Sequence, residues 1–254
     1  MAHVERLTLA RELRRFFEED ILEPVAVELR FGGAAAKHDV AEDRREVEDG
    51  GTDRPDSEFP ALEVTLDGGR HISFGGSIDR VDRTHDGTTV VSDYKTGAQA
   101  DLRDLLKDPV AGGQKLQLAV YAMAARAYLA GAGKVVARYW LTSWRRTAPS
   151  YACDLGERLE ERATEAMGLI VSGIESGAFP GVPGELDTRP GQTFANCHYC
   201  DFDRLCPADR DRRWSTVRES PAVAPVVFLK EAAPRDELAG VVSAMPLAPG
   251  EVAP

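Results

Sequence analysis

Apolar residues recur at helical spacing near the start of the chain and then alternate as in a strand. Five of them fall on one face of a helix predicted over residues 4–22: Leu9, Leu13, Phe16, Phe17 and Ile21. Residues 24–31 alternate as a strand after Pro24, which ends the helical pattern. Residues 33–57 are polar and rich in Gly and Asp, which predicts a long surface loop or a disordered insertion.

Strand-like and helical runs then alternate through the rest of the chain. Strands are predicted over residues 61–67, 70–83, 88–96, 134–144 and 149–155, and helices over residues 112–130 and 156–179. This order predicts an α/β fold with a mixed central sheet flanked by helices.

The same patterns predict three regions along the chain. The core is expected over residues 1–178, and residues 179–218 form a Pro/Gly linker followed by a cysteine-cluster segment. Residues 219–254 are rich in Pro and Ala with little periodicity, and we expect a disordered tail there.

Composition and charge narrow the class of protein. The chain has 254 residues, of which 43% are hydrophobic and 29% charged, so it can bury one sizeable core. It contains no long apolar run and no secretory signal pattern, and we expect a soluble, cytoplasmic protein without membrane contact. The net charge of −11 argues against a general polyanion binder but not against an enzyme that gathers carboxylates around metal ions.

Candidate chemistry begins at the sequence VSDYKTG. Residues two apart in a strand face the same way, so Asp93 and Lys95 share one face of the predicted strand. Asp79 lies in the preceding strand, within GGSIDRVD. An acid and a base placed side by side at a strand end indicate either a functional site or a weak surface ion pair, and from this short pattern alone the two are equally supported.

The turn between these two strands decides which residues face one another. A three-residue loop in which Gly87 is left-handed would pair His85 with Thr89. Counting back, Asp79 would lie across from Lys95 and diagonal to the other aspartate, on the same face. A two-residue loop would flip this face, so the prediction depends on the register.

Two carboxylates and a lysine on one sheet face suit a hard divalent cation. Mg²⁺ prefers carboxylate and water oxygens and is usually held by one or two protein carboxylates together with substrate phosphate. A metal held by Asp79 and Asp93 would polarise a phosphodiester, and Lys95 would orient the attacking water and stabilise the transition state. The chemistry expected from these residues is hydrolysis of a phosphodiester.

Three cysteines are clustered in CHYCDFDRLCP, at Cys197, Cys200 and Cys206. Clustered cysteines in a reducing compartment indicate a metal centre more readily than disulfides. Zinc and an iron-sulfur cluster are both chemically admissible, and His198 would complete a Cys3His zinc site in a binding module rather than an enzyme.

The ordered motifs GGSIDRVD, VVSDYKTG and QLAVYA resemble those of the PD-(D/E)XK nuclease superfamily. The likeness is to RecB-family exonucleases and to the nuclease domain of AddB-type helicase-nuclease subunits, over roughly residues 25–207. It implies a restriction-endonuclease-like core, with Asp79 and Asp93 as ligands of Mg²⁺ or Mn²⁺ and Lys95 as the catalytic lysine. The backbone carbonyl of Tyr94 is a further metal ligand in this reading.

The resemblance also implies roles for residues outside the two strands. Gln117 and Tyr121 match the family's Q-x-x-x-Y element and share one helix face. Arg80 is either a phosphate contact or the partner of Asp82 in an ion pair. Two further acids are left as ordinary strand residues: Glu28 and Glu63.

The implied function is a metal-dependent DNA exonuclease in double-strand-break repair and recombination. Its substrate would be single-stranded DNA or duplex ends, and a helicase subunit is a candidate partner. A CRISPR adaptation-type exonuclease and a catalytically weakened DNA-binding or assembly module are the alternatives.

The family likeness favours a 4Fe-4S cluster on the three clustered cysteines. Relatives carry a fourth cysteine far upstream, whereas here no cysteine precedes Cys153, which we expect to be a buried thiol. The fourth ligand is therefore not identified, and the cluster is expected to be incomplete in this chain. The only early histidine is His3, so the family's metal-binding histidine is not identified either, and we expect the chain to begin after the family's first motif.

Overall fold

The computed structural model of the chain consists of two compact units, Met1–Glu165 with Pro234–Pro254, and Ala166–Ala233. It describes residues 22–32, 59–95, 102–129, 131–141, 150–186, 193–198, 200–231 and 238–245, together with Leu7, Ala10 and Arg14. These three isolated positions are helical, while most of the helix predicted over residues 4–22 and the loop predicted over 33–57 lie outside the described residues.

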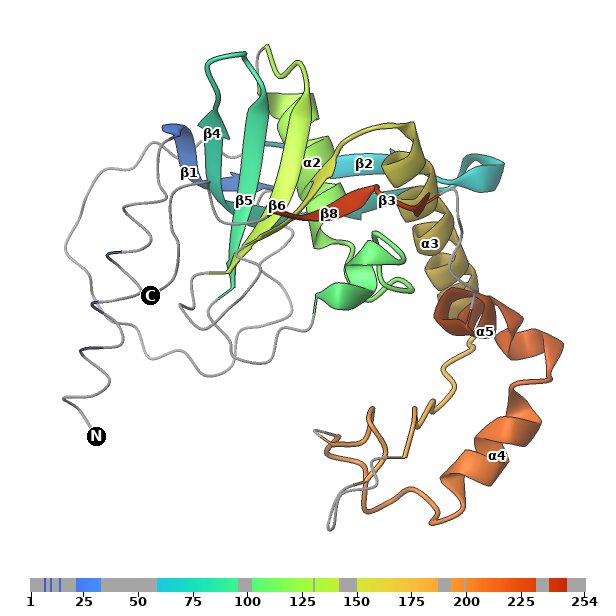
Figure 1. The fold of residues 1–254 in the computed structure, drawn as a ribbon. Helices are drawn as coiled ribbons and strands as arrows, with labels where there is room; N and C mark the ends of the chain where they lie inside the picture. The colour runs from blue at the N-terminus through green and yellow to red at the C-terminus, as the bar shows by residue number, and fades with distance from the viewer. Residues whose placement is uncertain are drawn as a thin grey trace, which may run out of the picture. The chain divides into compact units, whose positions relative to one another are not determined.

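A six-stranded mixed sheet forms the first unit (Figure 1). Its strands, in the order in which they lie side by side, are β1 (Glu23–Phe31), β4 (Gly76–Arg83), β5 (Thr89–Lys95), β6 (Val135–Leu141), β7 (Ser150–Asp154) and β8 (Val242–Met245). Strands β5 and β6 are parallel and the other neighbours are antiparallel. A parallel pair needs a crossover, and helix α2 (Gln117–Tyr128) lies in the connection between β5 and β6.

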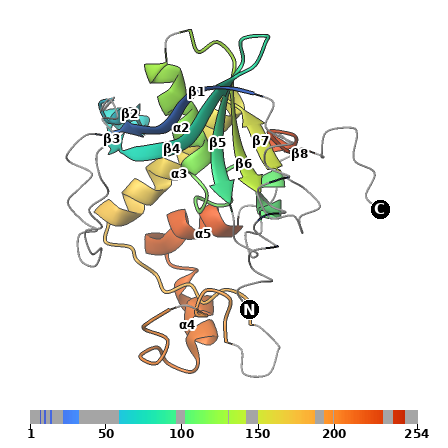
Figure 2. The same cartoon turned by 90° about the vertical axis from the view of Figure 1, so that its left-hand side faces the viewer.

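Helix α2 packs along one face of this sheet, over β5 and β6 (Figures 1 and 2). Its small side chains, such as Ala122 and Ala125, are fully buried, and they let the helix approach the strands closely. Val91 on β5 and Tyr139 on β6 are likewise buried. The mixed sheet with flanking helices confirms the predicted fold class.

A close contact between two glycines divides one predicted strand into two observed strands. The run predicted over residues 70–83 consists of β3 (His71–Phe74), which pairs with β2 (Leu62–Thr65), and β4, which enters the main sheet. The break falls at Gly75, because a Cβ on Gly32, whose φ is +98°, would lie 2.4 Å from the Gly75 Cα. The two backbones can pass this closely only without side chains. The hairpin between β2 and β3 contains a short 3-10 turn, η2 (Asp67–Gly69).

Helix α2 begins later than the pattern predicts. Residues 111–113 have positive φ and form a turn, so the helix starts at Gln117 rather than at residue 112. A short 3-10 segment, η3 (Arg103–Leu106), precedes this turn.

Helix α3 (Glu157–Glu175) follows β7, close to its predicted range. The second unit contains α4 (Arg210–Val217), η4 (Pro221–Val223) and α5 (Ala224–Glu231).

The stretch beyond residue 219 is not wholly unstructured, contrary to its composition. Helix α5 falls within it, and β8 pairs with β7 so that Val242 lies beside Cys153 and is 3% exposed. A strand of four residues is too short to show a sequence period, and its pairing with β7 stabilises it instead.

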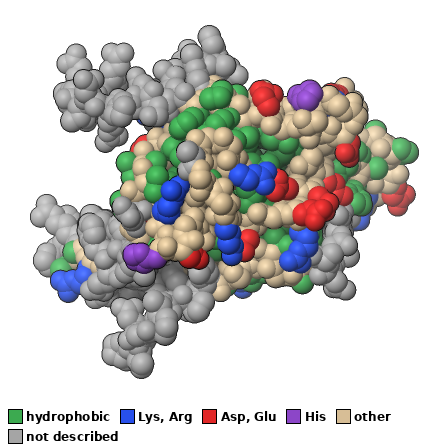
Figure 3. Space-filling view, turned by 90° about the horizontal axis from the view of Figure 1, so that it is seen from above, with side chains coloured by type: hydrophobic (Ala, Val, Ile, Leu, Met, Phe, Trp, Pro, Cys, Tyr) green, Lys and Arg blue, Asp and Glu red, His purple; other side chains and the backbone are tan. Residues whose placement is uncertain are grey.

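Two surface properties bear on function. Acidic and basic side chains are interspersed on the face of the molecule seen in Figure 3. Among the described helices, none is both long and apolar enough to cross a membrane.

Candidate active site

The hairpin of β4 and β5 brings the predicted acids together, but in a different register from the predicted one. Arg80 pairs with Ser92, and continuing by one residue sets Asp79 level with Asp93, not with Lys95. The turn has three residues as predicted and contains a left-handed Gly87, but it begins one residue earlier. The shift moves the pairing by two residues, so both acids remain on one face.

Asp79 connects β4 to β5 at the end of the hairpin that lies away from its turn. Its Oδ2 accepts a hydrogen bond of 2.8 Å from the backbone N–H of Tyr94. The carboxylate thereby lies against the backbone that links Asp93 to Lys95.

Asp93 is a nearly buried carboxylate beside a partly exposed lysine. It is 4% exposed, and its Oδ2 lies 2.6 Å from Lys95 Nζ as an ion pair. Burial raises the pKa of Asp93, Lys95 acts to lower it, and the nearby charge of Asp79 raises it further. The described partner of this buried oxygen is therefore the Lys95 ammonium.

Helix α2 adds a relay of two side chains to this lysine. Lys95 Nζ donates to Gln117 Oε1 at 3.1 Å, and Gln117 Nε2 donates to Tyr121 Oη at 3.2 Å. An ammonium can only donate hydrogen bonds, so Lys95 fixes the orientation of the Gln117 amide, with its oxygen toward Lys95 and its nitrogen toward Tyr121. The Tyr121 oxygen accepts from this nitrogen, so its own proton points toward a different acceptor. The predicted pair at i and i+4 therefore forms a connected chain from the lysine.

Burial and negative charge keep the phenol protonated. Burial raises the pKa of Tyr121, the bond from Gln117 lowers it, and the charges of Asp93, Asp79 and Glu28 raise it. A protonated phenol can donate a hydrogen bond to an anionic ligand.

Tyr139 is a neighbour of the site that the sequence pattern did not single out. It lies beside Asp93 in the parallel pair of β5 and β6, and Lys95 Nζ is 4.9 Å from the centre of its ring. Burial, followed by the charge of Asp93, strongly raises the pKa of this phenol. Only the β5–β6 register reveals the contact, because the two residues are far apart in sequence.

Arg80 pairs with Asp82, the second of the two roles considered for it. The Nε–Oδ1 distance is 2.6 Å and both side chains are buried, so the pair is not an exposed one. Arg80 also donates to the carbonyl of Leu22 at 3.3 Å.

The donor set fits one hard divalent cation. Two carboxylates on adjacent strand ends and the carbonyl of Tyr94 are oxygen ligands of the kind that Mg²⁺ uses, with water and phosphate to complete the sphere. No group of three or more His, Cys, Asp or Glu side chains that could hold a metal exists within the described part of the chain. A site here would therefore rest on Asp79 and Asp93 with non-side-chain ligands.

The three clustered cysteines lie in successive turns of the second unit. Cys200 N donates to Cys197 O, Cys206 N donates to Phe202 O, and none of the three thiols forms a disulfide. They do not form a ligand group in the described ranges.

Cys153 is the buried thiol that its pattern predicts. Burial raises its pKa to about 12, and its thiol contacts the carbonyl of Ala137 at 3.7 Å. A neutral thiol held in a sheet is a packing group rather than a metal ligand.

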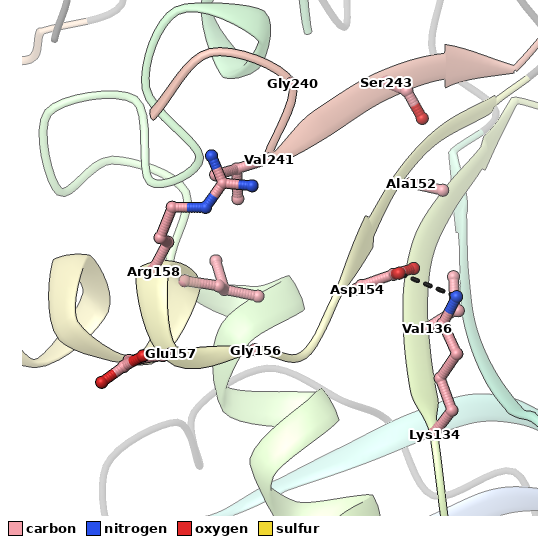
Figure 4. Close-up of a pocket in the computed structure, with 11 residues that line it drawn as sticks. Lys134, Val136, Ala152, Asp154, Gly156, Glu157, Arg158, Gly240, Val241 and Ser243 are labelled. Carbon is pink, nitrogen blue, oxygen red and sulfur yellow. Dashed lines mark ion pairs between the residues drawn. The ribbon is translucent and has the colours of Figure 1, made fainter. Parts of the chain in front are cut away.

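A separate cleft lies at the other end of the sheet (Figure 4). Lys134 and Asp154 line it and form an ion pair at 2.8 Å, with Arg158 and Val241 on its far side. Since β5 and β6 run in parallel, this cleft at the start of β6 is remote from Lys95 at the end of β5.

Comparison with known proteins identifies one family. The model of the PD-(D/E)XK nuclease superfamily matches residues 1–207. Among solved structures, the crystal structure of SSO0001 is 18% identical over 58% of this chain, with a TM-score of 0.26. That match spans 57% of the SSO0001 chain, little more than half its length. No curated protein matches the sequence.

Proposed function

We propose a function from one premise: the chain belongs to the PD-(D/E)XK nuclease superfamily. Nucleases of this superfamily are hydrolases that act on DNA and typically use divalent metals such as Mg²⁺. We infer that this chain is a metal-dependent DNA exonuclease. The observation that carries the proposal is the continuous set of contacts from Asp79 through the β5 strand end to Tyr121 on α2.

Each residue of this set has a role in the proposed reaction. Asp79, Asp93 and the carbonyl of Tyr94 would hold the Mg²⁺ or Mn²⁺ ion, which when bound polarises the phosphodiester and acidifies a coordinated water. Lys95 orients the attacking water and stabilises negative charge on the phosphate, since its ammonium is held by both Asp93 and Gln117.

Tyr121 completes the proposed site. Because Gln117 donates to its oxygen, its own proton is free to be donated to a phosphate oxygen of the DNA. The relay from Lys95 thereby couples the position of the catalytic ammonium to the position of the substrate.

We also propose a cellular location, a process, a partner and a cofactor for the enzyme. A cytoplasmic exonuclease that processes DNA ends in double-strand-break repair, with a helicase as partner, agrees with the family motifs. A 4Fe-4S cluster on Cys197, Cys200 and Cys206 is part of the same proposal, with zinc and His198 as the alternative. Anaerobically purified protein should be brown, whereas colourless protein with stoichiometric zinc would contradict the cluster.

The exonuclease activity is tested on two DNA substrates. With Mg²⁺ or Mn²⁺, the full chain should degrade an end-labelled linear duplex or single strand and leave a covalently closed circle intact. Chelation and the Asp93→Ala variant should each abolish the degradation. Cleavage of the circle at the same rate would contradict the exonuclease mode, and degradation by Asp93→Ala at the wild-type rate would contradict the assigned site.

A further inference from the structure

Glu28 occupies an unusual place in β1, next to the candidate active site. Val27 pairs with Arg80 and Leu29 pairs with Ile78, so Glu28 lies level with Asp79 on the neighbouring strand. Its φ is +50°, a left-handed conformation that non-glycine residues in strands rarely adopt. Such outliers cluster at functional sites, because the surrounding structure must hold them against their conformational cost.

Contacts and charge direct Glu28 toward the site. Its Oε2 accepts a hydrogen bond from Ser77 Oγ at 3.2 Å, two residues before Asp79 on the same strand. Its charge acts on the Tyr121 phenol together with those of Asp79 and Asp93, so all three carboxylates lie within electrostatic range of one hydroxyl. Glu28 remains exposed, and its carboxylate is accessible to water.

Asp93 is the nearly buried member of this group of three acids. Its Oδ2 is paired with the Lys95 ammonium at 2.6 Å. The charges of Glu28, Asp79 and Asp93 all act on the Tyr121 phenol, and a divalent cation bound at the aspartates would reduce the repulsion among these charges.

We propose that Glu28 is a positioning residue of the metal site, which accepts a hydrogen bond from a water coordinated to the cation held by Asp79 and Asp93. This inference rests on the proposed function. Contact through water, rather than direct coordination, agrees with the described part of the chain, in which Glu28, Asp79 and Asp93 do not form a three-carboxylate ligand group. Carboxylates that bind metal-bound water orient it and strengthen metal binding.

Manganese binding in the absence of DNA tests the proposal without reference to activity. The full chain, freed of metal by chelation, is titrated with Mn²⁺ by calorimetry, and free Mn²⁺ is counted in parallel by its electron paramagnetic resonance signal. Glu28→Gln should bind Mn²⁺ about tenfold more weakly, because loss of a water-mediated contact typically costs roughly 10- to 100-fold in metal affinity.

A second strand glutamate provides the matched control. Glu63 on β2 is also exposed and accepts a hydrogen bond from a serine, Ser73 on the paired strand, but it lies outside the main sheet. Glu63→Gln should bind Mn²⁺ with wild-type affinity. Equal weakening by both substitutions would mean that Glu28 acts only through overall charge and would overturn the proposal.

Two further variants distinguish a failure of the role proposed for Glu28 from a failure of the proposed function. Wild-type affinity in Glu28→Gln, with weakened binding in Asp93→Asn, would overturn the role of Glu28 and leave the proposed function intact. Wild-type affinity in Asp93→Asn would overturn both. Glu28→Gly suits the positive φ and should keep or raise the melting temperature while binding Mn²⁺ as weakly as Glu28→Gln, which excludes unfolding as the cause.

Discussion

At the scale of single residues, Asp93 serves the proposed metal site but lowers the stability of the metal-free protein. Its burial raises the pKa of the carboxyl, so the folded protein favours the protonated form, and stability falls as the pH rises from the unfolded value of 3.8 through the folded pKa. At neutral pH the ionised carboxylate therefore costs free energy in the metal-free protein.

The first prediction follows from this cost. In the presence of a chelator, Asp93→Asn should melt at a higher temperature than wild type, because the buried charge is removed at nearly constant volume. Mg²⁺ should then raise the melting temperature of wild type and not of the variant, since only the native site gains binding energy. Calorimetric melting with and without Mg²⁺ measures both effects, and a variant that melts below wild type in chelator would contradict the cost assigned to Asp93.

The second prediction concerns the relay on α2. Gln117→Leu breaks the contacts to both Lys95 and Tyr121, and a hydrogen bond to a charged group contributes about 1.5–3 kcal/mol, so kcat should fall roughly 10- to 100-fold. Tyr121→Phe removes only the hydroxyl and should cost less than about tenfold. Single-turnover cleavage rates at saturating Mg²⁺ show which variant loses more activity. A larger loss in Tyr121→Phe than in Gln117→Leu would contradict a relay that begins at the lysine.

Strand alternation explains why the sequence predicted the acidic face and not its exact partners. Asp79 and Asp93 remain on one face whenever the register shifts by two residues, so their convergence could be predicted. The residue opposite Asp79 depends on the residue at which the turn begins. The sequence pattern does not determine that residue to within one position. The role proposed for Glu28 was not predicted, because its signal is a backbone angle and not a residue pattern.

At the scale of elements, an ion pair between a buried arginine and a partly exposed aspartate holds the turn that leads into α2. Arg162 on α3 is 3% exposed and donates to both oxygens of Asp108, at 3.1 Å and 2.8 Å. Asp108 also accepts the backbone N–H groups of Val110 and Gly112. Although burial acts to raise it, these bonds hold the pKa of Asp108 below its ordinary value.

The third prediction compares this pair with the more exposed pair between Arg126 on α2 and Glu160 on α3. Arg162→Met removes the charged hydrogen bonds to Asp108 and should destabilise the fold by about 1.5–3 kcal/mol. Arg126→Met removes the partner of Glu160, whose pair with Arg126 is exposed to solvent, and should cost less than about 1 kcal/mol. Denaturant unfolding measures both, and equal losses would contradict the difference in burial.

Long, periodic elements could be predicted from the sequence, and short ones could not. The period of α3 is sustained over 19 residues, and its predicted range is close to the observed one. Strand β8 has four residues and forms only because β7 offers it a partner. The break between β3 and β4 depends on the approach of Gly32 to Gly75, a tertiary contact that strand patterning does not contain.

At the scale of the whole molecule, the net charge of −11 limits how this chain can bind DNA. Acidic and basic side chains are interspersed on the face in Figure 3, so the described residues on this face form no extended basic surface for a phosphate backbone. Affinity for DNA is then expected to depend on cations bound at the carboxylates, which reverse the local charge. This agrees with the proposed Mg²⁺ or Mn²⁺ dependence.

The catalytic role of Lys95 is tested most directly by comparing two ion pairs that lie near opposite ends of the main sheet. Lys95 pairs with Asp93 at the proposed site, and Lys134 pairs with Asp154 at the remote cleft. Single-turnover cleavage of end-labelled linear DNA is measured at saturating Mg²⁺ for Lys95→Ala and Lys134→Ala. Lys95→Ala should cleave at least about 100-fold more slowly than wild type, and Lys134→Ala should cleave at the wild-type rate. Cleavage by Lys95→Ala at the wild-type rate would contradict a catalytic role for Lys95.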